Sequence, residues 1–267
     1  MNGESEFKRK TAELWEKYKE ARAHVIRHAA RPGEEKDDHK SSGRQVFTDG
    51  FGFYKLFWVF ILCGFIGVVI EFFFVGIVHG EWMSRSSLVI GQFSVVWGFG
   101  GMLLTWALHR LIDKDDRYIF IAGTLLGGVF EYTCSYLGEK LFGCIFWDYS
   151  HMRFNIDGRV NLTYCLFWGI LALFWIKIIY PWMSKVIERI PVMIGKVSTY
   201  LILVLMVLDM AISAAALYRM NARDYGNTAK NWAEEFVDEH YTDEWIENRY
   251  RNMKLVREPE KNVDDAA

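Results

Sequence analysis

The sequence predicts an all-α, polytopic helical membrane protein with about five transmembrane helices between polar, helical N- and C-terminal regions. Three observations predict this fold. First, 52% of the residues are hydrophobic, although 24% are charged. Second, the two classes are segregated, because residues 1–53 and 219–267 are polar and most of 54–218 is apolar. Third, the apolar part divides into stretches of about 20 residues, the length that crosses a bilayer as a helix.

The N-terminal region, residues 1–53, is expected to be a cytosolic helix followed by a linker. Good helix formers occupy residues 4–30, Ser5 is the candidate N-cap, and Pro32 would end the helix. The chain does not open with a short apolar segment and a cleavage site, so we expect no cleaved signal peptide. The first apolar stretch would then act as the insertion signal.

Five apolar stretches are expected to cross the membrane. The second contains Gly91, Gly98, Gly100 and Gly101, and segments interrupted in this way are often broken or re-entrant around a site in transporters. Whether it spans or re-enters also decides the side of the C-terminus. The predicted spans are 54–78, 88–109, 118–142, 161–181 and 197–218.

Lysine and arginine near the ends of these spans favour one orientation. With five spans and a cytosolic N-terminus, more of these residues fall on the cytosolic side, as the positive-inside rule requires. The C-terminal region, 219–267, would then be external. Within it, residues from about 227 to 256 are expected to be helical, with Trp232, Phe236 and Trp245 available for packing.

Several carboxylates fall inside predicted spans, where burying a charge is costly and ionisable residues are functional candidates. They are Glu71, Glu131, Glu139 and Asp209. Two interpretations stay open. Each acid could pair with a cation at a span end and lock helices together, or it could serve as a proton or cation partner in a polar cavity. The cations available for the first interpretation are Lys140, Arg159, Arg219 and Arg223.

A polar segment between the third and fourth apolar stretches is the leading candidate for solute recognition. Irregular backbone in contact with lipid leaves amide groups unpaired, so this segment must lie at an interface or line a protein cavity. Its arginine could grip a phosphate or carboxylate through a planar fork. The alternative is an interfacial turn with its Trp and Tyr at headgroup depth. The candidate residues are Trp147, Asp148, Tyr149, Ser150, Asn155 and Arg159.

Other function classes lack their motifs. The net charge of −2 gives no reason to expect nucleic acid. The sequence has no P-loop, no H-E-x-x-H or Cys/His cluster and no G-x-S-x-G elbow, so we assign no nucleotide, metal, cofactor or catalytic residue to this chain. The 4 cysteines form no C-x-x-C pair and are expected to be buried free thiols.

A series of motifs over roughly residues 54–256 carries a family resemblance. The motifs are Gly64-x-x-Gly67-x-x-x-Glu71, Gly98-x-Gly100, Glu131-Tyr132-x-x-Ser135, Glu139-Lys140-x-Phe142-Gly143, Trp147-Asp148-Tyr149-Ser150, Phe154-Asn155, Gly158-Arg159, Trp168-Gly169, Asp209, Ser213, Arg219 and Arg223. Together they resemble the bacterial family of ABC-transporter permeases labelled type IV. One departure is that members often have Gly-Pro and Tyr-Gly where this chain has Gly91-Gln92 and Trp97-Gly98.

The resemblance implies a multi-pass protein of the bacterial inner membrane, assigned to transport of an unspecified solute. If ATP drives transport, a separate ATPase subunit must hydrolyse it, and we expect a homo-oligomer in the lipid bilayer. Our expectation is a transporter subunit in which Glu71 and Glu131 face a polar cavity, and Asp148, Asn155 and Arg159 gate or recognise the solute. The alternatives are an intramembrane enzyme acting on a lipid-linked substrate and a non-catalytic membrane scaffold or sensor.

Overall fold

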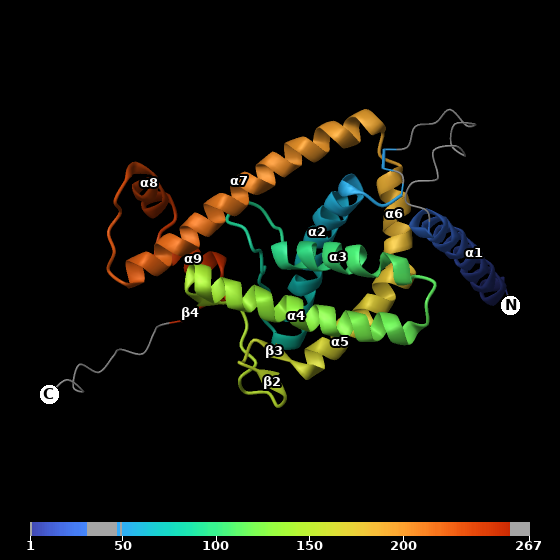
Figure 1. The fold of residues 1–267 in the computed structure, drawn as a ribbon, viewed down its shortest axis with the longest axis horizontal. Coiled ribbons are helices and arrows are strands. Elements are labelled where there is room, and N and C mark those ends of the chain that lie inside the picture. Colours follow the sequence, from blue (N-terminus) through green and yellow to red (C-terminus); the bar gives the residue numbers. More distant parts are fainter. Residues whose placement is uncertain (1, 31–46, 49, 257–267) are drawn as a thin grey trace.

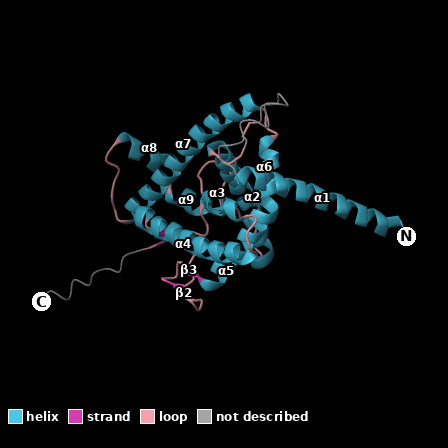
Figure 2. Ribbon diagram, turned by 45° about the vertical axis from the view of Figure 1, so that its right-hand side comes forward, coloured by secondary structure: helices cyan, strands magenta, loops and turns pink. Residues whose placement is uncertain are grey.

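The computed structural model describes residues 2–30, 47–48 and 50–256 (Figure 1). The fold is a set of helices with four very short strands (Figure 2), which confirms the predicted all-α class. In chain order the elements are α1 Asn2–Ala30, α2 Phe53–His79, α3 Val95–Leu108, η1 His109–Leu111, α4 Asp116–Phe142, β1 Cys144–Ile145, β2 Asn155–Ile156, β3 Val160–Asn161, α5 Leu162–Phe174, η2 Trp175–Ile179, α6 Tyr180–Glu188, α7 Val192–Asp224, α8 Trp232–His240, α9 Asp243–Arg249 and β4 Lys254–Leu255.

Among the described residues, three segments are long and apolar enough to cross a membrane as helices. Phe53–Val78 lies in α2, Leu162–Glu188 joins α5, η2 and α6, and Val192–Asp224 is α7. They correspond to the predicted spans 54–78, 161–181 and 197–218. Among the described residues, α4 is not one of these candidates, although its 27 residues cover the predicted span 118–142.

The remaining predicted span, 88–109, is discontinuous. Residues 88–94 are irregular and α3 begins only at Val95, after Ser94 accepts a hydrogen bond from the Trp97 amide. A positive φ of 71° at Gly91 is one reason that no helix forms earlier. The 14 residues of α3 span about 21 Å, too short for a bilayer of about 30 Å. The break that the glycines suggested therefore lies before α3.

Helices α4 and α5 form an antiparallel hairpin, and small residues bring them together. Gly123 faces Ala172 and Gly127 faces Trp168, and a β-carbon at either glycine would collide with that side chain. The Gly-x-x-x-Gly spacing thus serves close packing within one chain. The segment 143–161, which contains the predicted recognition residues, closes the hairpin.

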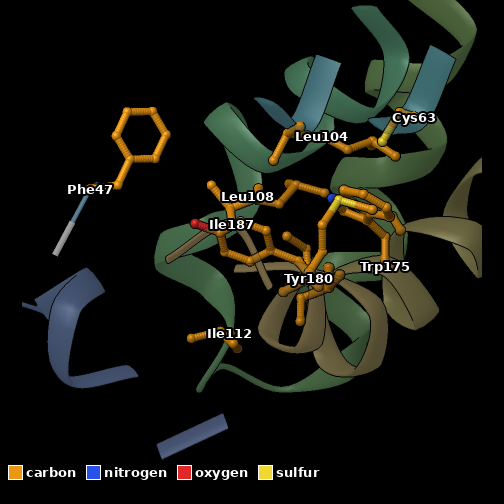
Figure 3. Close-up of a cluster of buried hydrophobic side chains, with 13 residues drawn as sticks. Phe47, Cys63, Leu104, Leu108, Ile112, Trp175, Tyr180 and Ile187 are labelled. Atoms are coloured by element: carbon orange, nitrogen blue, oxygen red, sulfur yellow. The ribbon is translucent and has the colours of Figure 1, made fainter. Parts of the chain in front are cut away.

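A hydrophobic core includes Ile119, near the N-terminal end of α4, and Figure 3 shows the side chains of this cluster. It contains Cys63 of α2, Leu104 and Leu108 of α3, and Trp175 and Ile187 from the segment after α5. The buried indole of Trp175 donates a hydrogen bond of 2.8 Å to Thr105, so its polar atom is satisfied inside the core. All four cysteines are free, and Cys63 and Cys144 are buried.

The polar terminal regions are helical, as predicted. Helix α1 lies beside α6, and the predicted stop at Pro32 falls outside the described residues. The C-terminal region forms α8 and α9 on the end of α7, and β4 pairs with β1. The aromatic residues predicted to pack there are exposed instead. The exposed fraction of the residue is 79% for Trp232, 49% for Phe236 and 38% for Trp245.

Candidate functional site

The segment 80–108 crosses the fold in two parts. Its irregular part, residues 80–94, returns from the end of α2 to its middle, where the Ser94 amide donates to the Gly64 carbonyl at 3.1 Å. Helix α3 completes the crossing, because the His109 ring stacks 3.8 Å from the Phe51 ring just before α2. We call 80–108 the discontinuous segment. The C-terminal ends of α2 and α3 therefore lie at opposite ends of α2.

Helix α7 supplies hydrogen-bond partners for the backbone of this irregular part. The Ser213 hydroxyl accepts from the Val89 amide at 2.9 Å, and the Asp209 carboxylate accepts from the Ile90 amide at 3.2 Å. Backbone amides at membrane depth need such partners because lipid offers none. Asp209, a predicted site residue, therefore supports the backbone here.

Helix α9 supports the same stretch from the other side. The Arg249 guanidinium donates to the Leu88 carbonyl at 2.8 and 2.6 Å and also to the Gly91 carbonyl. The Tyr250 hydroxyl donates to the Ser87 carbonyl at 3.3 Å. Sequence reasoning gave Arg249 and Tyr250 no role, since both lie in the polar region far along the chain from residue 88.

The first acid of the predicted spans, Glu71 of α2, is partly buried and accepts a hydrogen bond of 2.7 Å from the Trp97 indole of α3. Gly67 permits this approach, because a β-carbon there would collide with Trp97. Arg85, in the irregular part of the discontinuous segment, interacts electrostatically with the same carboxylate. Glu71 is thus held at the junction of α2, α3 and that segment.

The second acid, Glu131 of α4, is partly buried and accepts a hydrogen bond of 2.7 Å from the Tyr149 hydroxyl. The Tyr149 ring stacks on Tyr164 with centroids 4.6 Å apart. The Trp168 indole lies beside the carboxylate and interacts with it. Even so, the buried Oε2 atom of Glu131 has no partner at hydrogen-bonding geometry among the described residues.

The charge of Arg85 acts on the surroundings of both acids. Besides Glu71, its charge interacts with the Tyr149 phenol, which binds Glu131. Its buried Nε atom lacks a hydrogen-bond partner within the described part of the chain. Sequence reasoning missed Arg85, and a lone cation just before a glycine-rich segment was the available signal. We call Glu71, Arg85, Trp97, Glu131, Tyr149 and Trp168 the polar centre.

Most other predicted residues of segment 143–161 shape a turn. The Asp148 carboxylate accepts from the Ser150 amide at 2.9 Å, and this bond lowers the pKa of Asp148. The Asn155 side chain accepts from the Gly158 amide at 2.9 Å. The Trp147 indole donates to the Arg159 carbonyl at 2.9 Å. These contacts fit the interfacial-turn interpretation of Trp147, Asp148, Ser150 and Asn155.

Glu139 and Arg159 form an ion pair that links α4 to the closing segment. Their charged atoms are 2.5 Å apart, and Arg159 also donates to the Ser135 hydroxyl at 3.4 Å. The guanidinium lies over the rings of Tyr132 and Tyr136, at 5.9 and 5.6 Å from their centroids. Glu139 therefore fits the first interpretation of the acids in the predicted spans, in which the carboxylate pairs with a cation and holds two segments together.

Arg219 and Arg223 of α7 hold the C-terminal helices. Arg219 is only 4% exposed and donates to Asp238 at 2.9 and 2.6 Å. Arg223 also pairs with Asp238 and binds Asp243 at 2.5 Å. The hydrogen bond from Arg219 lowers the pKa of Asp238. Among the described residues, neither arginine forms a hydrogen bond or ion pair with Asp209, and the cation whose charge acts on that acid is Arg249.

Comparison with known proteins identifies one family. No curated protein and no solved structure matches the chain. A family model described as "Putative ABC-transporter type IV" matches residues 58–214, more than half of the chain. The match contains the whole polar centre and ends before Arg219 and Arg249. The chain is therefore a membrane protein of the family with that description, as its motifs indicated.

Proposed function

We propose that this protein is the membrane-embedded subunit of a transporter and that the polar centre recognises the solute as it crosses. The observation that carries the proposal is the position of Glu71 and Glu131. Each acid is partly buried on a different helix and bound by an aromatic donor, and the charge of Arg85 from a non-helical segment acts on Glu71 and on Tyr149, the partner of Glu131. Discontinuous segments that bring polar groups to the middle of the membrane are typical of transporter binding sites.

The environment of Asp148 and of the C-terminal tail makes the two alternatives weaker. In the enzyme alternative, Asp148 or Glu131 would act as the general base. A base must take up a proton, whereas the Ser150 amide stabilises the ionised form of Asp148. A scaffold that binds partners through free charged tails fits poorly with a C-terminal region bound to α7 by Arg219 and Arg223.

The proposal includes a separate ATPase subunit, since this chain has no P-loop motif. It also includes a homo-oligomer in the bacterial inner membrane with a cytosolic N-terminus. Purification from the native host in mild detergent tests the ATPase directly. We expect an ATPase in stoichiometric amount. A purified protein that still moves solute without any ATPase would contradict this part of the proposal.

Solute profiling tests the role of the polar centre while the solute itself is still unidentified. Host cells that lack the gene are complemented with wild-type protein, Glu71→Gln or Glu131→Gln at equal membrane levels. Solutes inside and outside the cells are then compared by mass spectrometry. We expect the wild type to restore the distribution of at least one solute and both variants to fail.

The control is Glu81→Gln, which makes the same change at an exposed position after α2. It should behave as the wild type. Two results would contradict the proposed function. In one, deleting the gene changes no solute distribution; in the other, both polar-centre variants restore the wild-type distribution in full.

A further inference from the structure

Glu131 differs from the other acids of the predicted spans in its partners. Glu139 pairs with Arg159, and the charges of Arg85 and Arg249 act on Glu71 and Asp209. The partners of Glu131 in the described part of the chain are the Tyr149 hydroxyl and the Trp168 indole, and neither carries a positive charge. A buried carboxylate without a counter-ion is costly, so this position favours a cation from outside the chain.

Two buried polar atoms of the polar centre are left without hydrogen-bond partners among the described residues. One is an acceptor, Oε2 of Glu131, and the other is a donor, Nε of Arg85. Helix α3 brings the two halves of the site together, because its Trp97 lies in the half with Arg85 and its Gly100 faces Trp168, beside Glu131. A ligand that satisfies both atoms must donate hydrogen bonds at one end and accept them at the other.

The aromatic side chains around Glu131 indicate the charge of the donating end. Tyr149, with Tyr164 stacked on it, and Trp168 lie beside the carboxylate. Electron-rich ring faces attract ammonium groups, and a carboxylate strengthens that preference. An ammonium group near Arg85 would be repelled, and a carboxylate on the same ligand offsets the repulsion.

We propose that the polar centre binds a small zwitterion, with its ammonium group at Glu131 and its carboxylate at Arg85. This inference rests on the proposed function, because it names the solute class for the same site. The guanidinium has five donors, so Arg85 can face Glu71 and the ligand carboxylate together. The ligand adds no net charge to the membrane interior.

A binding assay on the purified full-length chain in detergent tests the class. The standard α-amino acids are added one by one, and ligand binding is measured as a rise in the unfolding midpoint. Each amino acid that binds is compared with the amine that lacks its carboxylate and the acid that lacks its amine. We expect at least one amino acid to bind and neither analogue to bind at the same concentration.

Variants locate the binding site. Glu131→Gln and Arg85→Gln should each weaken the affinity about tenfold or more, because each loses a charge-assisted hydrogen bond. Glu139→Gln is the matched control on the same helix. It should lower the unfolding midpoint of the free protein and leave the affinity unchanged.

The inference is overturned if no amino acid binds, if an analogue with a single charge binds equally well, or if Glu131→Gln keeps the wild-type affinity. These results are distinguishable from failure of the proposed function. If the solute distributions in cells still depend on Glu71 and Glu131, the protein is a transporter whose solute belongs to a different class.

Discussion

Glu131 and Glu139 lie about two turns apart on α4, yet their surroundings differ. Glu139 is locked to Arg159, whose guanidinium also contacts Ser135 and two tyrosine rings. Glu131 has a neutral donor on one oxygen and leaves the other without a partner in the described structure. In this pair, the role of a carboxylate on a membrane helix depends on which groups satisfy its oxygens. A satisfied acid stabilises the fold, and an unsatisfied one is available to a ligand.

The largest expected effect comes from breaking the satisfied pair. Arg159→Ala leaves Glu139 partly buried without its counter-ion and should destabilise the protein by about 3 kcal/mol. Chemical denaturation of the purified protein in detergent measures this loss. The double variant Glu139→Gln with Arg159→Gln should be more stable than Arg159→Ala. Equal stability of the wild type and Arg159→Ala would refute the locking role.

A smaller effect is expected where α9 supports the discontinuous segment. Arg249→Ala removes the hydrogen bonds to the Leu88 and Gly91 carbonyls and should cost about 2 kcal/mol. Hydrogen exchange should show faster opening of residues 86–94, with α4 and α5 unchanged. Arg251→Ala, at an exposed neighbouring position, is the control. Unchanged exchange in the Arg249 variant would exclude this support.

The smallest effect concerns pH and the C-terminal helices. The pKa of Asp238 is lowered in the folded state by its bond to Arg219. Its stabilising contribution is therefore complete above the unfolded-state pKa of about 3.9 and is lost as pH falls through the lower folded-state value. Acid should release α8 from α7 across that range. Asp238→Asn should show faster exchange in α8 already at neutral pH, and protection equal to wild type would count against the ion pair.

The helical part of the fold could be predicted from the sequence because apolar length and glycine spacing specify membrane helices directly. The segments near 54, 118, 161 and 197 all became helices, and the Gly123 and Gly127 spacing became a packed hairpin. The interruption before α3 was also expected from its glycines. Its boundary at Val95 depends on the Ser94 cap, which periodicity does not reveal.

The candidate site could be predicted only in part. Glu71, Glu131 and Tyr149 were named, because a buried charge or an aromatic next to polar residues stands out in an apolar stretch. Arg85 and Trp97 were missed, since their importance depends on which irregular segment folds back to which helix. Asp209 was named because it lies in an apolar stretch, but its partners are the Ile90 amide and the Ser213 hydroxyl, and no residue pattern specifies the first of these.

The most direct test of the account compares Glu131→Gln with Glu139→Gln in one experiment, measuring unfolding of the purified proteins and solute distribution in complemented cells. We expect Glu131→Gln to keep wild-type stability within about 1 kcal/mol and to lose transport. We expect Glu139→Gln to lose stability while the folded fraction still transports. A Glu131→Gln protein that transports normally, or that loses transport only because it unfolds, would contradict the central claim.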